Sequence, residues 1–225
     1  MRLLLIRHGQ TPANVDGILA TSHPGPGLTP LGHRQAEALP EALSDESIAA
    51  VYVSSLVRTH LTAAPLADRL GVTPVETEGL HEIEAGDLEG RADLAAVRGY
   101  QGTLKAWGDG DLSHAMPGGP DGVAFFARFD GAVQRIAAAH PDETVAIVSH
   151  GAAIRVWCGG VPVNVDPAFA IAHELDNTGI VTLTGSPEAG WVLESWMGEP
   201  IGGSSVDDDG GPDPTGDPIR STHSA

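Results

Sequence analysis

The sequence predicts an α/β fold built on a mostly parallel sheet. Short, uninterrupted apolar runs alternate along the chain with longer segments of helical periodicity, which is the pattern of strands and helices taking turns. The runs at 3–6, 51–53 and 145–148 show no polar alternation, as expected for strands covered on both faces. Two later runs, 180–183 and 191–196, are joined by TGSPEAG and predict a hairpin.

Two segments carry clear helix signals. Thr29 and Pro30 combine a capping hydroxyl with a proline in the first turn, which favours a helix start. The range 121–140 is the clearest helix, because apolar residues recur there at helical spacing: Phe126, Phe129, Val133 and Ile136. Pro40 and Pro65 lie inside segments of helical character, where we expect a kink or an early end.

Length and composition indicate one globular domain followed by a polar tail. The chain has 225 residues, of which 41% are hydrophobic, so it can bury one full core. Beyond residue 197 the chain is rich in Gly, Pro, Ser and Asp and has little to bury. We therefore predict a domain at 1–197 and a flexible tail at 198–225, with its DDDGG run in solvent.

The charge balance argues against several classes of partner. There are 12 Lys and Arg residues against 30 Asp and Glu residues, and the formal net charge of -18 repels nucleic acid and anionic membranes. The lone Cys158 excludes an internal disulfide, and the N-terminus lacks the pattern of a signal peptide. No apolar run has the length of a membrane span. We expect a cytoplasmic protein that binds neither nucleic acid nor membranes.

One sequence pattern occurs twice. RLLLIRHG at 2–9 and VAIVSHG at 145–151 are each an apolar strand that ends in a histidine and a glycine. In an open parallel sheet, ligands bind beyond the carboxyl ends of the strands, where helix N-termini present their amides. If the two strands are neighbours, His8 and His150 meet there beside Arg7 and form a pocket for an anion such as phosphate.

Two further charged residues fit the same pocket. Arg58 lies in SSLVRTHLTA, just past the second strand, and a guanidinium grips phosphate oxygens in pairs. Glu82, in LHEIEAGDLEG, supplies a carboxyl group near that rim. Three acidic neighbours leave the identity of the acid open: Glu84, Asp87 and Glu89.

This set of residues suits phosphoryl transfer. A neutral His8 can be the nucleophile, since the unperturbed pKa of histidine is about 6.5. Glu82 would protonate the leaving group, provided that its surroundings raise its pKa. The phosphate oxygens would be held by Arg7, Arg58 and His150. Because arginines supply the positive charge, the chemistry needs no metal. Any one of these residues alone would more simply be structural, and the repeated pattern favours the functional interpretation.

The motifs resemble those of the histidine phosphatase family, the phosphoglycerate mutase-like proteins, in which Arg-His-Gly-Glu/Gln-Thr opens the chain. RHGQT, LTPLGHRQA, SSLVRTHLTA, LHEIEAGDLEG and SHGAAIR follow the family's order and span most of residues 2–155. The resemblance implies a three-layer α/β/α sandwich. It also implies a phosphohistidine on His8, a proton donor in Glu82, and phosphate ligands in Arg7, Asn14, Arg58 and His150.

Two residues join the candidate site less directly, and one segment departs from the family. Gly151 follows His150 at the predicted helix start, and Thr21 lies one residue after the place where the family commonly has a small hydroxyl residue. Pro120 and Asp121 stand where members often carry Glu-Ser. Only about thirty residues separate Gly90 from Asp121, without the long insertion of the mutases, which favours water as the acceptor.

The predicted function is a metal-independent phosphatase that hydrolyses a small phosphorylated metabolite, acting as a monomer or homodimer and without a cofactor. One alternative is a phosphoglycerate mutase, which would need a 2,3-bisphosphoglycerate primer. Another is a catalytically weak phosphate-binding protein. Turnover of an aryl phosphate in chelator separates the last from the others, because a pure binder shows none.

Overall fold

The computed structural model describes residues 1–203, 205–207 and 213–219. In this part of the chain six strands form one sheet in the order β3-β2-β4-β1-β5-β6. The parallel strands are β1 (Arg2–Arg7), β2 (Ile48–Val53), β3 (Val75–Glu76) and β4 (Thr144–Ser149). The antiparallel edge consists of β5 (Ile180–Ser186) and β6 (Gly190–Met197). The predicted mostly parallel α/β sheet is confirmed, and so is the late hairpin.

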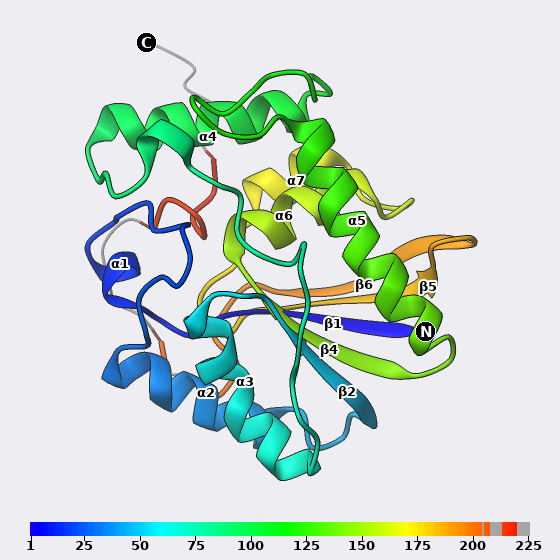
Figure 1. Cartoon of the computed structure of the whole chain (residues 1–225). Helices are drawn as coiled ribbons and strands as arrows, with labels where there is room; N and C mark the ends of the chain where they lie inside the picture. The colour runs from blue at the N-terminus through cyan, green and yellow to red at the C-terminus, as the bar shows by residue number, and fades with distance from the viewer. Residues whose placement is uncertain (204, 208–212, 220–225) are drawn as a thin grey trace.

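Helices cover both faces of this sheet and make the predicted three-layer sandwich. Figure 1 shows α2 and α3 on one face and α5, α6 and α7 on the other, with α4 above them. The helices are α1 (Pro12–Val15), α2 (Pro30–Ala42), α3 (Val57–Leu70), α4 (Leu94–Gly108), α5 (Gly122–Ala139), α6 (Gly151–Gly160) and α7 (Pro167–Ala172). A 3-10 turn, η1 (Gly86–Leu88), follows the Glu82 loop. No helix in the described ranges is long and apolar enough to cross a membrane.

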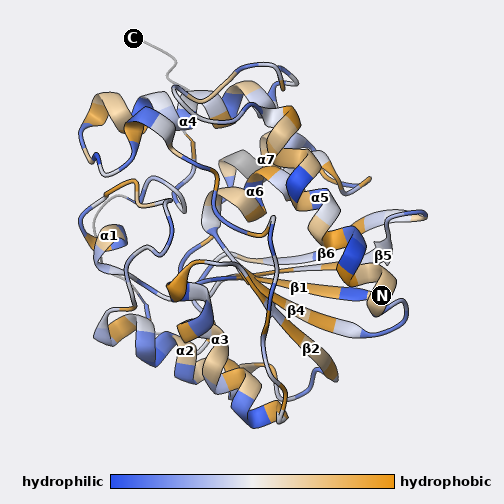
Figure 2. Cartoon of the chain, viewed as in Figure 1, coloured by the Kyte–Doolittle hydropathy of each residue, from blue (hydrophilic) through white to orange (hydrophobic). Residues whose placement is uncertain are grey.

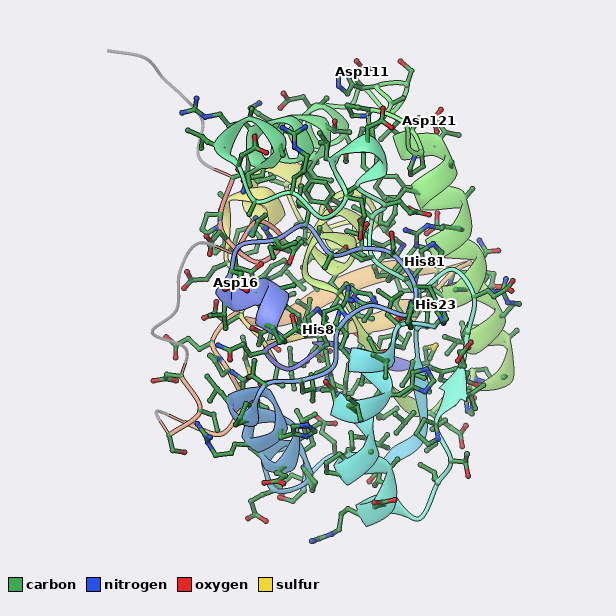
Figure 3. The ribbon with its side chains drawn as sticks, turned by 60° about the vertical axis from the view of Figure 1, so that its left-hand side comes forward. His8, Asp16, His23, His81, Asp111 and Asp121 are labelled. Carbon is green, nitrogen blue, oxygen red and sulfur yellow. The ribbon has the colours of Figure 1, made fainter. Side chains whose placement is uncertain are left out.

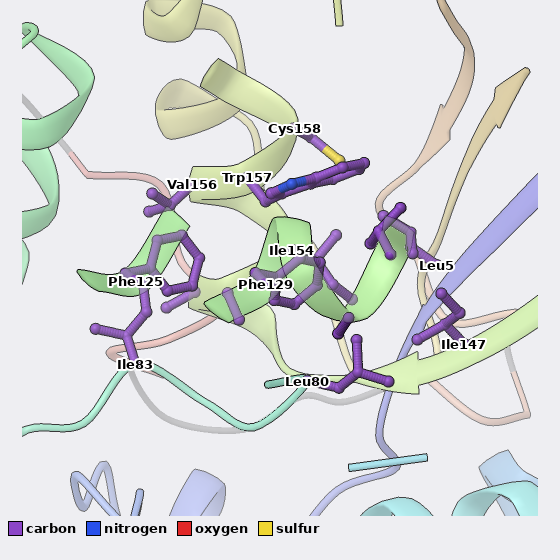
Figure 4. Packing of buried hydrophobic residues seen from close by; sticks show 14 of the residues in the cluster. Leu5, Leu80, Ile83, Phe125, Phe129, Ile147, Ile154, Val156, Trp157 and Cys158 are labelled. Carbon is purple, nitrogen blue, oxygen red and sulfur yellow. The ribbon is translucent and has the colours of Figure 1, made fainter. Parts of the chain in front are cut away.

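The core is divided by the sheet into two parts, because successive side chains of a strand point to opposite faces. Leu4 and Ile6 of β1 pack with the α2 and α3 side, while Leu3 and Leu5 pack with the other. The strands appear as apolar bands at the centre of Figure 2. Figure 4 shows the larger part around Trp157. Full burial on both faces explains why the strand sequences lack alternation.

Some helix details differ from the prediction. Helix α2 continues past Pro40, and α3 continues past Pro65, so neither proline ends its helix. Each proline removes one backbone donor, and the helix persists because apolar residues next to it, such as Leu39 and Leu66, are buried in the core. In α5 the buried stripe begins at Phe125 rather than Phe126.

Part of the segment predicted as a flexible tail packs against the domain. Leu175 donates its backbone N–H to the carbonyl of Gly216 at 3.1 Å, and Thr215 is buried. Composition did not reveal this, because the segment has few apolar residues to bury, yet those few, Ile201, Val206 and Ile219, are buried or pack against the core, and polar contacts add to them. Residues 204, 208–212 and 220–225, which include most of the DDDGG run, lie outside the described residues.

Candidate active site

The two strand-histidine-glycine segments meet at one edge of the sheet. β1 and β4 are parallel neighbours with Arg7 opposite Ser149, so the next residue of each strand leaves the sheet at the same place. The rings of His8 and His150 lie 5.2 Å apart between centroids, at an interplanar angle of 61°. Both are buried. In Figure 3, His8 is labelled near the middle of the view and Asp111 at its upper rim. The two strands are therefore neighbours, which was the condition for His8 and His150 to meet.

The ring of His8 is oriented by its own backbone neighbour. Its Nδ1 lies 2.8 Å from the carbonyl oxygen of Gly9. Since a carbonyl only accepts, Nδ1 carries the hydrogen and Nε2 keeps its lone pair. Burial, with the nearby charges of Arg58 and Arg7, holds the pKa of His8 well below its usual value. The ring is therefore neutral at neutral pH, with Nε2 available as a nucleophile.

His150 has the opposite arrangement. Its Nε2 lies 2.7 Å from the Ser54 hydroxyl, at the end of β2. Its Nδ1 is buried and has no hydrogen-bond partner among the described residues. Burial lowers the pKa of His150 well below its usual value, with Arg58 adding to the shift. When Ser54 donates to Nε2, the imidazole hydrogen is on Nδ1, which makes that atom a donor for a ligand.

The two arginines add further donors to the same pocket. Arg58, in the first turn of α3, is buried, and burial lowers its pKa to about 10, so it stays charged at neutral pH. Within the described ranges, Nε and Nη1 of Arg58 and Nε of Arg7 have no hydrogen-bond partner. Buried donors normally have acceptors. A cluster of unpartnered cationic donors is therefore suited to bind an oxyanion.

Glu82 lies at the N-terminus of α6, the helix that follows His150. One carboxylate oxygen accepts from the backbone N–H groups of Ile83 at 2.8 Å and Ala153 at 2.9 Å, and the other from Ala152 at 3.2 Å. Burial raises the pKa of Glu82, against the opposing effect of these N–H groups and of Arg58. A buried carboxyl group with a raised pKa is suited to donate a proton.

The other acids of the loop have different environments. Although burial raises the pKa of Glu84, a hydrogen bond from His81 and the charge of Arg128 lower it to about 2. Glu89 accepts from the Thr21 hydroxyl at 2.5 Å. Asp87 is exposed. Of the four acidic residues, Glu82 is the one that is fully buried and has a raised pKa.

The comparisons with known proteins show the family of the chain. The family model of the histidine phosphatase superfamily (branch 1) matches residues 3–198. The chain belongs to this superfamily. It is 35% identical over 152 residues to the adenosylcobalamin/alpha-ribazole phosphatase of Escherichia coli, which covers 67% of this chain and 73% of that protein. The structure of mycobacterial glucosyl-3-phosphoglycerate phosphatase with VO3 aligns with a TM-score of 0.74 and 26% identity, covering 88% of this chain and 99% of that one.

A third similar protein is longer than this chain. The PE-PGRS family protein PE_PGRS11 of Mycobacterium tuberculosis is 39% identical over 218 residues, which cover 89% of this chain. The chain spans 37% of the length of that protein. The similarity to this protein thus concerns only part of its length.

The remaining predicted site residues have different surroundings. Asn14 is the third residue of α1, and its side-chain oxygen accepts from the backbone N–H of Thr11, the N-cap, at 2.9 Å. Thr21 is buried, but its hydroxyl contacts Glu89 and accepts from the backbone of Ala85 at 2.9 Å, so it braces the acid loop. Gly151 is the first residue of α6, and an added Cβ there would lie 2.9 Å from Nε of Arg7.

Three residues that contact the site were not predicted from the sequence. Ser54 could have been noticed, because it ends the second strand within a quoted motif. Arg128 donates to the carbonyl oxygens of His81 and Glu82, both at 2.8 Å. The feature of the sequence that could have indicated Arg128 is a cation within the apolar helix α5. Asp213 contacts Arg7 from more than two hundred positions away, and no local pattern indicates that contact.

Proposed function

We propose that this histidine phosphatase hydrolyses a small phosphomonoester through a phosphohistidine on His8. One observation carries the proposal. The bond from Nδ1 of His8 to Gly9 leaves Nε2 with its lone pair, in a buried pocket that also holds the unpartnered donors of Arg58 and His150. A binding pocket needs the donors, but it does not need an oriented nucleophile or a buried acid.

In the first step, Nε2 of His8 attacks phosphorus, and the bond from phosphorus to the ester oxygen breaks. The donors of Arg7, Arg58 and His150 stabilise the charge on the other phosphoryl oxygens. Glu82 gives its proton to the departing oxygen, so an alcohol leaves and a carboxylate remains. Because these side chains supply the positive charge, we propose that the reaction needs no metal ion.

In the second step, water attacks the phosphohistidine. Glu82, now ionised, takes a proton from the water. The water oxygen bonds to phosphorus at the same time, and the phosphorus–nitrogen bond breaks. His8 is released neutral and Glu82 is protonated again, so inorganic phosphate leaves and the site returns to its first state. The interval between Gly90 and Asp121, without a long insertion, supports water as the acceptor.

The relatives support a small phosphorylated metabolite as the substrate class. Two of them are named as phosphatases of alpha-ribazole and of glucosyl-3-phosphoglycerate. These compounds differ outside the phosphate, which fits a family that shares the phosphate pocket and varies the rest of the site. We therefore propose the reaction type and the phosphate ligands for this chain, and leave the alcohol part of the substrate to experiment.

The test is release of inorganic phosphate from a panel of small phosphomonoesters in chelator. His8→Ala removes the nucleophile, and His60→Ala is the matched control, because its ring lies at the surface of α3 beside Glu76. We expect release by wild type and by the control, and none by His8→Ala. Quenching during turnover with an alkaline denaturant should leave a phosphoryl group on the peptide that contains His8, because the phosphorus–nitrogen bond is hydrolysed in acid and survives in alkali.

Other outcomes would contradict the proposal in different ways. Interconversion of phosphoglycerates that requires a 2,3-bisphosphoglycerate primer, without hydrolysis, would make the protein a mutase. Phosphate binding without turnover of any ester would make it a phosphate-binding protein. Equal activity in wild type and His8→Ala would place the reaction elsewhere.

A further inference from the structure

A turn near the C-terminus contacts two of the predicted phosphate ligands. The carboxylate of Asp213 forms an ion pair with Nη2 of Arg7. The same carboxylate oxygen accepts from the side-chain amide of Asn14 at 3.2 Å. Arg7 and Asn14 were selected from the sequence as groups that hold phosphate oxygens. A carboxylate of the chain's own tail occupies both.

The turn 213–217 is internally ordered in a way that fixes this carboxylate. Oδ1 of Asp213 accepts from the backbone and the hydroxyl of Thr215, at 3.1 and 3.0 Å. The backbone N–H of Asp213 donates to Asp217 at 2.9 Å. One oxygen of Asp213 is therefore held by the turn, while the other is presented to the site.

The turn also fits closely against the site. A Cβ added at Gly216 would lie 2.0 Å from Nη1 of Arg7, and one added at Gly151 would lie 2.7 Å from the carbonyl oxygen of Thr215. Glycine at both positions lets the two segments approach. Arg155 of α6 donates to the Thr215 carbonyl at 3.2 Å. The contact thus joins matched surfaces of the tail and the domain.

Charge makes this contact relevant to phosphate binding. Burial raises the pKa of Asp213, but the charge and hydrogen bond of Arg7 and the hydrogen bonds from Thr215 together lower it below its usual value, so the group is a carboxylate at neutral pH. Carboxylate and phosphate oxygens bind a guanidinium in the same manner. While Asp213 is in this position, its carboxylate uses the donors Nη2 of Arg7 and the side-chain amide of Asn14, which a bound phosphate would need. The negative charge of Asp213 also repels a phosphate dianion.

We propose that Asp213 sets the affinity of the active site as an internal competitor of the substrate phosphate. The phosphoryl group gains Arg7 and Asn14 in full only when the turn 213–217 withdraws. Apparent affinity is then the intrinsic affinity reduced by the fraction of molecules in which the turn has withdrawn. The proposal rests on the proposed function, because it needs these two residues to bind the substrate.

The experiment compares Asp213→Asn with Asp207→Asn in the full chain. Both variants remove one negative charge from the tail, but Asp207 is exposed. Titration calorimetry with inorganic phosphate gives Kd without turnover, and steady-state hydrolysis of one phosphomonoester separates kcat from KM. We expect Asp213→Asn to lower Kd and KM by about 3- to 10-fold without lowering kcat, and Asp207→Asn to match wild type.

A second variant reaches the same contact by a different route. Gly216→Ala places a methyl group against Arg7 and should displace the turn, leaving Asp213 itself unchanged. We expect the same fall in Kd and KM as for Asp213→Asn. Agreement between the two variants would tie the effect to the docked turn.

Each other outcome overturns the inference. A lower kcat with unchanged Kd in Asp213→Asn would mean that the carboxylate positions Arg7 and does not compete. If wild type hydrolyses phosphomonoesters and Asp213→Asn has the same Kd and KM as wild type, Asp213 is not a competitor, while the proposed function stands. If no variant binds phosphate and wild type hydrolyses nothing, the proposed function fails as well.

Discussion

The two strand-histidine-glycine segments share one pattern, an apolar strand that ends in His-Gly, and they end in the same pocket, yet their histidines use opposite ring nitrogens to contact the protein. His8 uses Nδ1 to contact Gly9 and leaves Nε2 open, whereas His150 uses Nε2 to contact Ser54 and leaves Nδ1 without a partner among the described residues. One ring thus offers a lone pair and the other a hydrogen. The difference shows that the motif places an imidazole and that its neighbours assign the role.

The largest expected effect tests this division of roles. His8→Ala should lower kcat by at least about 10³-fold, because the nucleophile is lost, whereas His150→Asn should lower it by about 10²-fold, because one donor to the oxyanion is lost. Rapid-quench labelling with a phosphomonoester measures the phosphoenzyme directly. It should be absent in His8→Ala and present in His150→Asn. Phosphoenzyme formation in His8→Ala would reverse the assignment.

The second prediction concerns Glu82 as the acid that protonates the leaving group when His8 attacks phosphorus. Glu82→Gln should lower kcat by about 10²- to 10⁴-fold on alkyl phosphates, whose leaving oxygen needs a proton. On nitrophenyl phosphate the loss should be much smaller, since that leaving group is stable as an anion. Glu84→Gln is the control, because its low pKa keeps it ionised at neutral pH. An equal loss on both substrates would exclude proton donation by Glu82.

Glu82 also predicts the pH profile. Its pKa is raised, so the protonated acid is lost as pH rises through that value, and kcat/KM falls on the alkaline side. The pKa of His8 is lowered, so the neutral nucleophile is lost only at more acid pH. In Glu82→Gln the alkaline fall in kcat/KM should disappear for an alkyl phosphate while the acid limb remains. Retention of the alkaline limb would assign it to another group.

A smaller effect should follow from the partner that distinguishes His150. Ser54→Ala removes the hydroxyl from Nε2 and leaves the ring free to change tautomer, so we expect kcat to fall about 10-fold. Leaving a buried nitrogen without a partner should also cost about 1–3 kcal/mol of unfolding free energy. The neighbouring Ser55→Ala should change neither, as judged by steady-state kinetics and urea unfolding. A Ser54→Ala variant with wild-type kcat would show that Ser54 does not set the tautomer.

The sequence predicted those parts of the molecule that depend on local pattern. Unbroken apolar strands, a strand end followed by His-Gly, and a hairpin signal were enough for the sheet, its three layers and the pocket near His8 and His150. Of the kink or early end expected at Pro40 and Pro65, the early end does not occur, because burial of neighbouring residues outweighs the loss of one hydrogen bond.

The contacts of Ser54 and Asp213 show what local pattern cannot provide. Whether an imidazole is a nucleophile or a donor depends on a hydroxyl brought from another strand. The contact of Asp213 with Arg7 joins residues that are 206 positions apart, in a segment whose composition predicts no structure. Both are properties of tertiary packing, and neither leaves a periodic signal in the sequence.

The smallest expected effect is on the pH dependence of the unfolding free energy, and it should be similar for His8 and His150. Both histidines have folded pKa values below the 6.5 of an unperturbed ring. Below pH 6.5 their rings therefore bind protons in the unfolded chain and stay neutral in the folded chain. The contribution of the two rings to stability is therefore largest above pH 6.5 and falls as pH drops from there toward the folded pKa values, by up to about 1.4 kcal/mol per pH unit for each ring. Urea unfolding from about pH 7.5 to about pH 5.5 should show a shallower slope in His8→Asn and in His150→Asn, and an unchanged slope in His60→Asn. A slope that stays the same in both buried variants would mean that these rings are charged in the folded protein, and neither could then serve as a neutral nucleophile.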